Sequence, residues 1–346
     1  TFTKNRGPDA NNFFSNESVT IGHDRLSILD LNERSNQPYL YKNLILSFNG
    51  EIFNYLDLKK DLVSKGYKFK TTSDTEVVIY LFHKYGIDSF KKLSGIFAIS
   101  IWDNLKKTLY LIRDIVGVKP LYYHETKNND IIYSSSINSI LSTDQKFDLN
   151  ERALFYYKNI GRNEGAETFF KGIFKLLPGE LLIKEKNKDK KVIKFLNFKF
   201  TKLKDIKAAE EISDIIKSQF LSDVPVALSL SGGIDSNIIY SIMRDNLEKK
   251  NYNIYSFHFQ NYQKFNQDFA TAKQNCKKYG NNLNQIEINY KDYQNNIEDV
   301  IKILEEPLSN QGSVLNYVLA KNVTEKVIIT GDGGDEIFGG YDHYRS

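Results

Sequence analysis

The pattern of apolar residues in this chain of 346 residues changes near residue 208, and that change restricts the fold more than any other feature. Before it, short apolar runs are separated by Gly, Asn and Asp, which is typical of strands joined by hairpins. After it, continuous apolar runs alternate with segments of helical periodicity, which indicates buried parallel strands joined by helices. The sequence therefore predicts an α+β sandwich followed by an α/β doubly wound parallel-sheet domain.

The predicted elements follow this division. In the first part we expect strands at residues 19–21, 44–48, 96–102, 108–112, 121–124 and 131–134, with helices at 55–65 and 76–85. In the second part we expect helices at 208–221, 236–248, 269–279, 296–304 and 314–321, with strands at 224–230, 254–259, 285–288 and 327–330. Residues 184–207 are rich in Lys and predict an edge hairpin and linker between domains 1–183 and 208–346.

Composition excludes several classes of protein. Hydrophobic residues make up 41% of the chain, which excludes a disordered polypeptide. The longest apolar run, residues 95–102, is far shorter than the roughly 20 residues of a membrane span. The 47 basic residues nearly balance 43 acidic ones, and Arg is scarce, so nucleic-acid binding is not expected. The single cysteine, Cys276, excludes a disulfide framework and is typical of a reducing cytoplasm.

A Gly-rich turn follows the predicted strand at 224–230 and precedes a predicted helix. Its glycines, Gly232 and Gly233, let the backbone approach an anion, and the helix N-terminus directs free N–H groups toward it. Ser231 and Ser236 add hydroxyl donors, and Asp235 supplies a carboxylate for a divalent cation. The alternative is an ordinary strand–turn–helix corner in which Asp or Ser caps the helix. The loop resembles the pyrophosphate-binding SGGxDS loop of enzymes that cleave ATP between its α and β phosphates.

A second Gly-rich loop, residues 329–341, follows the last predicted strand. In open α/β sheets ligands bind at the carboxyl ends of strands, so we expect the two loops to share one crevice. Acidic residues in such a loop, Asp335 among them, suit Mg²⁺ bound together with phosphate oxygens. The alternatives are a calcium loop, whose EF-hand spacing is not matched, or a polar turn.

The first part contains a dispersed set of polar residues. Taken singly, Asn49-Gly50 is a type I′ hairpin turn, Arg25 a surface salt-bridge residue and Asp74 a helix N-cap. Taken together with Glu51, they provide an Arg for an α-carboxylate, two acids for an α-ammonium, and an amide plus a Gly N–H for an oxyanion. This combination describes a site for glutamine.

The ordered set of motifs resembles the glutamine-hydrolysing asparagine synthetase family over nearly the whole chain. The motifs are Asn5-Arg-Gly-Pro-Asp9, Arg25-Leu-Ser-Ile28, Asn49-Gly-Glu51, Ser73-Asp74, Gly117-Val-Lys-Pro-Leu121, Leu177-Pro-Gly179, Ser231-Gly-Gly-Ile-Asp-Ser236 and Gly331-Asp-Gly-Gly-Asp-Glu-Ile-Phe-Gly-Gly-Tyr341.

The resemblance implies a class II glutaminase with an N-terminal-nucleophile-hydrolase fold, followed by a synthetase domain that adenylates aspartate with ATP and Mg²⁺. In the glutaminase it implies that Arg25 binds the glutamine carboxylate, that Glu51 and Asp74 hold its amino group, and that Asn49 and Gly50 form the oxyanion hole. In the synthetase it implies pyrophosphate contacts from residues 231–236, Mg²⁺ on Asp235 and Asp335, and nucleoside contacts from Leu230, Phe259, Thr330 and Gly331. It leaves a homodimer open.

The chain also departs from the family pattern. The family's nucleophile is a Cys at the mature N-terminus, and Cys276 cannot replace it because it lacks a free α-amine. Since the chain starts at Thr1 and stops at Ser346, we expect a fragment without glutaminase activity that lacks a Lys important to the synthetase. Asn5 stands where the family usually has His, Ser136 where it has Glu, and Asn266-Gln267 where it has an acidic pair.

Two other functions are left open. One is a related amidotransferase that acts on another carboxylate, such as a sugar uronate, a peptide or a β-lactam precursor. The other is a glutamine- or nucleotide-binding module without turnover. Retention of Arg25, Asn49 and Asp74 together argues against β-lactam chemistry alone.

Overall fold

The computed structural model describes residues 2–143, 145–196, 208–246, 252–261, 266–341 and 344. The chain forms two compact units, Thr1–Lys202 and Leu203–Ser346. Within the described residues no helix is long and apolar enough to cross a membrane.

An antiparallel six-stranded sheet forms the centre of the first unit, in the order β11-β10-β6-β5-β4-β3. Its strands are β3 (Tyr39–Tyr41), β4 (Leu44–Ile52), β5 (Gly95–Asp103), β6 (Thr108–Arg113), β10 (Glu180–Glu185) and β11 (Lys191–Lys194). The longest pairing joins β4 to β5, with Leu44 opposite Asp103 and Ile52 opposite Gly95. β10 and β11 are thus part of this sheet, whereas residues 197–207, which belong to the predicted linker, lie outside the described residues.

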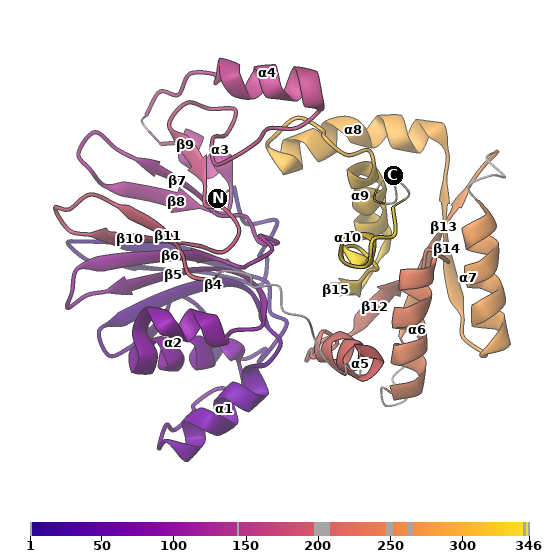
Figure 1. Cartoon of the computed structure of the whole chain (residues 1–346), viewed down its shortest axis with the longest axis horizontal. Coiled ribbons are helices and arrows are strands. Elements are labelled where there is room, and N and C mark those ends of the chain that lie inside the picture. Colours follow the sequence, from indigo (N-terminus) through magenta and orange to yellow (C-terminus); the bar gives the residue numbers. More distant parts are fainter. Residues whose placement is uncertain are drawn as a thin grey trace. The chain divides into compact units, whose positions relative to one another are not determined.

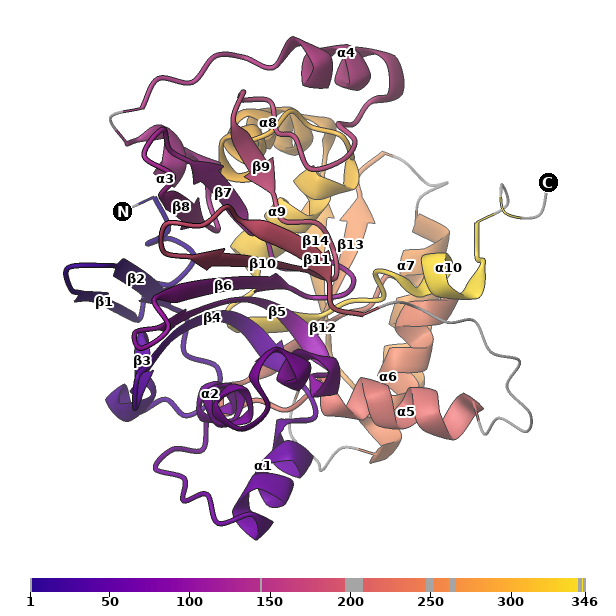
Figure 2. The same cartoon turned by 60° about the vertical axis from the view of Figure 1, so that its left-hand side comes forward.

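Two layers cover this sheet (Figure 1). On one side α1 (Tyr55–Ser64) and α2 (Asp74–Tyr85) bury apolar side chains such as Leu62 and Ile79 against it. On the other side lies a smaller sheet of β7 (Tyr122–Glu125), β8 (Ile131–Ser134) and β9 (Ile173–Lys175), which contributes Tyr123 to a second core (Figure 2). The remaining elements of this unit are β1 (Ala10–Ser15), β2 (Thr20–Arg25), η1 (Glu33–Ser35), η2 (Gly86–Lys92), α3 (Ile137–Leu141) and α4 (Glu151–Ile160).

The second unit contains a parallel four-stranded sheet in the order β14-β13-β12-β15. Its strands are β12 (Val226–Ser229), β13 (Asn253–Phe259), β14 (Leu283–Ile288) and β15 (Val327–Ile329). Its helices are α5 (Ala208–Ser218), α6 (Ile234–Asn246), α7 (Asn266–Lys278), α8 (Tyr290–Leu304), α9 (Gly312–Asn322) and α10 (Gly334–Phe338). Side chains of α6 and α7 pack on one face, and those of α9 pack on the other.

This strand order positions a ligand site. The chain passes from β12 to β13 and β14 in one direction, and then returns to place β15 on the opposite side of β12. The loops that leave β12 and β15 therefore lie at the point where the strand order reverses, which is where doubly wound sheets bind ligands.

The predicted fold class is confirmed in both units. The predicted strands and helices coincide with observed elements, with ends that differ by a few residues. The sequence reasoning missed β1, β3, β9, α3, α4 and α10. The assignment of residues 1–183 and 208–346 as separate functional domains stays a prediction.

Candidate functional site

A cavity of about 340 Å³ opens in the first unit beside strands β4 and β5 of the six-stranded sheet. The five residues predicted to bind glutamine all line it: Arg25, Asn49, Gly50, Glu51 and Asp74. They come from the end of β2, the second half of β4 and the first residue of α2. The structure therefore brings together residues that are up to 49 positions apart in the sequence.

The Asn49-Gly50 pair is not a hairpin turn, so that alternative is wrong. Both residues lie inside β4, where Asn49 pairs with Ala98 and Gly50 with Phe97. Gly50 has a φ of 148°, and a Cβ at this position would lie 2.0 Å from the Ile96 carbonyl oxygen. Glycine is required here because the neighbouring strand leaves no room for a side chain.

Arg25 is not a surface residue, which overturns the salt-bridge alternative. Its side chain is buried at 5% exposure, and its four terminal N–H groups point into the loop at residues 29–36. Nη1 donates to the Asn32 carbonyl at 3.1 Å and to Oδ1 of Asn36 at 2.9 Å. Nη2 donates to the carbonyls of Leu29 and Asp30 at 3.0 and 2.6 Å. The guanidinium thus holds this loop against the cavity.

Asp74 is not the N-cap of α2, because that position belongs to Ser73. The Ser73 hydroxyl accepts from the Thr75 N–H, whereas Oδ2 of Asp74 accepts from the Ile52 N–H at 3.0 Å. Burial raises the pKa of Asp74 to about 6 against the opposing effect of these hydrogen bonds. Its carboxyl group therefore changes charge within the physiological pH range while it ties the end of β4 to α2.

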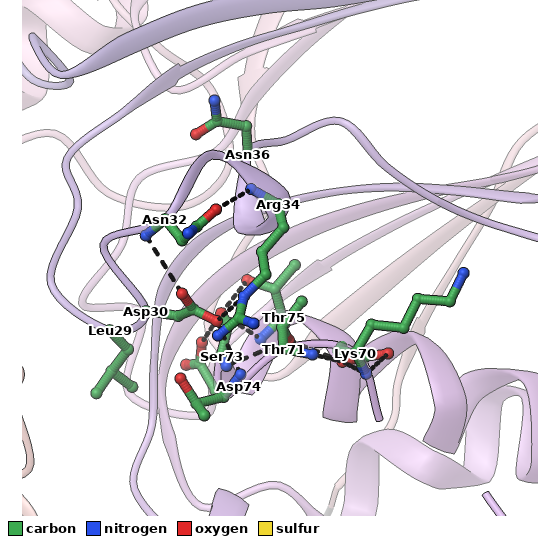
Figure 3. Close-up of polar contacts among 12 residues, drawn as sticks. Leu29, Asp30, Asn32, Arg34, Asn36, Lys70, Thr71, Ser73, Asp74 and Thr75 are labelled. Carbon is green, nitrogen blue, oxygen red and sulfur yellow. Dashed lines mark hydrogen bonds and ion pairs between the residues drawn. The ribbon is translucent and has the colours of Figure 1, made fainter. Parts of the chain in front are cut away.

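Two further carboxylates, Asp30 and Glu76, hold loops beside the cavity. Oδ2 of Asp30 accepts from Nε of Arg34 at 3.1 Å (Figure 3). It also accepts from the Thr72 N–H at 2.8 Å, which joins two segments that meet beside α2. Burial alone would raise the pKa of Asp30, but the hydrogen bonds, led by that of Thr72, lower it to about 2. Glu76, fully buried, accepts from the N–H groups of Lys70 and Thr71.

Other residues at or near the cavity were missed or gave weak signals. His23, two residues before Arg25 on β2, lines the cavity with its Nδ1 2.9 Å from Oγ of Ser47. Burial lowers the pKa of His23 to about 4, so it is neutral at pH 7. Ser136, where the family has Glu, caps α3 through the Ser139 N–H. A single His in an alternating strand carries no sequence signal that separates it from a core residue.

In the second unit the two Gly-rich loops meet, as predicted. A Cβ at Gly331 would lie 3.2 Å from the Ser236 nitrogen, and one at Gly334 would lie 2.4 Å from Oδ2 of Asp235. Two glycines of the β15 loop therefore face the start of α6. Asp235 lies in the first turn of α6, which begins at Ile234, so the alternative that it caps a helix beginning at Ser236 is wrong.

Hydrogen bonds fix the conformation of the β12 loop. Oγ of Ser231 and Oγ of Ser236 are 3.0 Å apart, and each accepts from a backbone N–H of the glycine pair. Nδ2 of Asn237 donates to the carbonyls of Gly232 and Gly233 at 2.7 and 2.9 Å. These contacts fix the turn between β12 and α6, so that the N–H groups at the start of α6 remain as donors for an anion.

The predicted nucleoside residues lie at the carboxyl ends of three adjacent strands. Leu230 and Thr330 directly follow β12 and β15, and Phe259 is the last residue of β13. Leu230 is fully buried, and its N–H donates to the Tyr255 carbonyl at 2.8 Å. The side chain of Asn266, one of the departures from the family pattern, pairs with both backbone groups of Phe259.

The residues predicted to bind Mg²⁺ have suitable chemistry. Asp235, in the first turn of α6, approaches Gly334, the neighbour of Asp335 in the sequence, so the two acidic residues lie on adjoining segments. Within the described ranges no cluster of three or more His, Cys, Asp or Glu could hold a metal ion by protein ligands alone. Mg²⁺ commonly uses one or two carboxylates and completes its shell with phosphate oxygens and water, which this pair fits.

Comparison with family models shows the class of protein to which the chain belongs. Residues 2–195 match the family model for a glutamine amidotransferase domain, and residues 207–346 match the model for asparagine synthase. The cavity with the residues predicted to bind glutamine lies in the range matched by the first model, and the two Gly-rich loops lie in the range matched by the second.

Curated relatives narrow this class to a family. The chain is 32% identical to asparagine synthetase 1 (glutamine-hydrolyzing) of Bacillus subtilis, an alignment that covers 98% of this chain and 54% of the relative. It is 30% identical to putative asparagine synthetase 2 (glutamine-hydrolyzing) of Methanocaldococcus jannaschii, over 98% of this chain and 70% of the relative. It is 29% identical to Amidase chry2 of Gibberella zeae, over 99% of this chain and 54% of the relative. The chain belongs to the glutamine-hydrolysing asparagine synthetase family, and it spans about half the length of the first of these relatives.

Proposed function

We propose that this chain is part of an ATP-dependent asparagine synthetase that uses glutamine as its nitrogen donor. The observation that carries the proposal is the cavity of the first unit, where a guanidinium, two carboxylates, an amide and a glycine N–H occur together. These groups match the charges of glutamine and of the tetrahedral intermediate formed when its side chain is hydrolysed.

In the glutaminase half, Arg25 attracts the α-carboxylate of glutamine, and Glu51 with Asp74 holds the α-ammonium. Asn49 donates its amide N–H to the developing oxyanion together with the backbone N–H of Gly50. The strand β4 fixes this pair because it is hydrogen-bonded to β5 on one side and tied to α2 through Asp74 on the other. Preorganised donors of this kind need little rearrangement during the reaction.

In the synthetase half, ATP occupies the crevice between the loops that follow β12 and β15. The N–H groups at the start of α6 and the hydroxyls of Ser231 and Ser236 hold the pyrophosphate part. Asp235 and Asp335 would hold Mg²⁺, which neutralises phosphate charge when it is bound. The aspartate carboxylate becomes activated as an adenylate with release of pyrophosphate, and ammonia from glutamine then displaces AMP.

A second candidate differs only in the carboxylate that receives nitrogen. Amidase chry2, with 29% identity, does not carry the name of an asparagine synthetase, so relatives at this level of identity include proteins named for another activity. Assaying amide formation with aspartate and with other carboxylates, in the presence of ATP and ammonia, separates the two candidates. Amide formation with aspartate and with no other carboxylate tested would support asparagine synthesis.

The glutaminase assignment is tested by Asn49→Ala in the full-length protein. Loss of one oxyanion donor should lower glutamine-dependent turnover about 10²–10³-fold. Synthesis from free ammonia should change little, because it does not use the cavity. Asn128→Ala, an exposed position of the same unit, is the matched control. Equal loss with both nitrogen donors would contradict the proposal.

A further inference from the structure

Lys119 lines the glutamine cavity, and none of the functions described above uses it. It belongs to the segment Gly117-Val-Lys-Pro-Leu121, which follows β6 and precedes β7. In the sequence this segment is one of the ordered motifs. Lys119 places a cation beside the residues proposed to recognise glutamine.

The loop that carries Lys119 is held from within by the carboxylate of Asp114. Asp114 is buried at 1% exposure, and its two oxygens accept five backbone N–H groups at 2.6–3.2 Å. The donors are Phe97, Val116, Gly117, Val118 and Lys119. A buried carboxylate with this many donors fixes the course of the loop.

Arg113 holds the same loop from the outside. Its Nε donates to the Lys119 carbonyl at 2.8 Å, and its Nη2 donates to the Gly117 carbonyl at 2.6 Å. Gly117 has a φ of 77°, and a Cβ there would lie 2.7 Å from Cγ of Pro178, so the turn requires glycine. The backbone of Lys119 is therefore held by both Asp114 and Arg113, at a point where the residue lines the cavity.

The ammonium group of Lys119 has no hydrogen-bond or ion-pair partner in the part of the chain that the structure describes. Burial lowers the pKa of Lys119, and the charge of Glu51 opposes that shift more than any other group. Glu51 and Lys119 both line the cavity. An ammonium that is partly withdrawn from water and has unused donors is suited to bind an anionic group of a ligand.

The state of Arg25 supports the same conclusion. All four of its terminal N–H groups already donate to the loop at residues 29–36. A carboxylate bound by Arg25 alone would have to use the remaining Nε donor or break these bonds. Two other cations line the cavity: Arg6, whose Nη1 donates to the Ser135 carbonyl at 2.7 Å, and Lys119, whose ammonium can supply the donors that Arg25 lacks.

We propose that Lys119 is a further substrate-binding residue of the glutaminase cavity, whose ammonium binds the α-carboxylate of glutamine next to Arg25. The α-carboxylate and the α-ammonium of an amino acid share one carbon atom. A neighbouring pair of opposite charges, Lys119 and Glu51, therefore complements both groups at once. This inference rests on the proposed glutaminase function, and it adds a specificity residue for the amino-acid end of the substrate.

The test uses Lys119→Met in the full-length protein, with Lys119→Arg and the exposed Lys127→Met as controls. Glutamine hydrolysis is measured with glutamate as a product inhibitor. Loss of a charge-assisted contact should raise the KM for glutamine and the Ki for glutamate by the same factor, about 10- to 100-fold. The kcat should stay within about threefold, because the contact is equal in ground and transition states. Lys119→Arg should restore most of the affinity.

The outcomes separate the inference from its premise. A wild-type protein that does not hydrolyse glutamine would contradict the proposed function itself. An active wild type whose Lys119→Met variant keeps both constants overturns the inference alone. A rise in the Ki for glutamate without a rise in the KM would place Lys119 at the γ-carboxyl end and also overturn it. A fall in kcat that Lys119→Arg does not restore would indicate a structural role.

Discussion

At the scale of single residues, the cavity owes its charge pattern to how each side chain is buried. Asp74 and Asp30 are both buried carboxyl groups, yet their pKa values move in opposite directions, to about 6 and about 2. Both carboxylates accept several hydrogen bonds, but one of those to Asp30 comes from the cationic Arg34. The hydrogen bonds to Asp74 do not offset the cost of burial, which is the largest influence on its pKa.

This difference predicts a pH dependence of glutamine recognition. Below its pKa of about 6 the Asp74 carboxyl group is neutral and no longer attracts the α-ammonium of glutamine, which stays protonated. We expect the KM for glutamine to rise as the pH falls from 7 to 5. In Asp74→Asn the KM should be high at every pH and lack this inflection. A persistent inflection in that variant would assign it to another group.

At the scale of elements, β4 is the strand on which the glutaminase assignment depends. The sequence Asn49-Gly50 suggested a turn because this dipeptide favours positive φ at both positions. In the structure only Gly50 has a positive φ, and the strand continues to Ile52 because β5 pairs with it throughout. Tertiary pairing thus overrides a strong local turn signal.

Gly50→Ala should therefore destabilise the first unit. The added Cβ would lie 2.0 Å from the Ile96 carbonyl oxygen, in a backbone conformation that favours glycine. We therefore expect the free energy of unfolding to fall by about 2–4 kcal/mol. Gly66→Ala is the matched control, since Gly66 also has a positive φ but open space around it, and it should cost about 1 kcal/mol. Urea unfolding can be followed through Trp102, the single tryptophan, which lies buried in β5. An equal fall in the free energy of unfolding in the two variants would show that the structure shifts to relieve the clash at Gly50.

At the scale of the whole molecule, the predictable parts are those whose signal is local. The apolar run of β12, the glycines after it and the helix α6 are contiguous, so their strand–loop–helix structure followed from the sequence. The hydrogen bonds that hold the loops beside the cavity are not local in sequence: Asp30 accepts from the N–H of Thr72, 42 residues away. Taken singly, Arg25 suggested a surface residue because most of its partners are backbone carbonyls, which any residue type provides.

If each unit carries its own activity, a substitution in one unit should leave the activity of the other intact. Asp235→Asn in the second unit tests this expectation. Asn has the same size and suits the first turn of α6, so the fold should survive, while a hard anionic ligand for Mg²⁺ is lost. In the full-length protein we expect pyrophosphate release to collapse with glutamine and with ammonia, because adenylation precedes amide formation. Glutamine hydrolysis should continue at a measurable rate.

Pyrophosphate release and melting temperature must be measured on the same sample, with Asp214→Asn on the exposed face of α5 as the matched control. Normal pyrophosphate release in Asp235→Asn would remove this carboxylate from the ATP site. A large fall in melting temperature without ligand would assign Asp235 a structural role, because its carboxylate already lies against the backbone of Gly334 in the neighbouring loop. Loss of pyrophosphate release at an unchanged melting temperature is the result that a role beside the phosphates requires. Hydrogen bonds of Asn237 and the two serines hold the glycine turn that precedes α6, so the turn should keep its conformation in the variant.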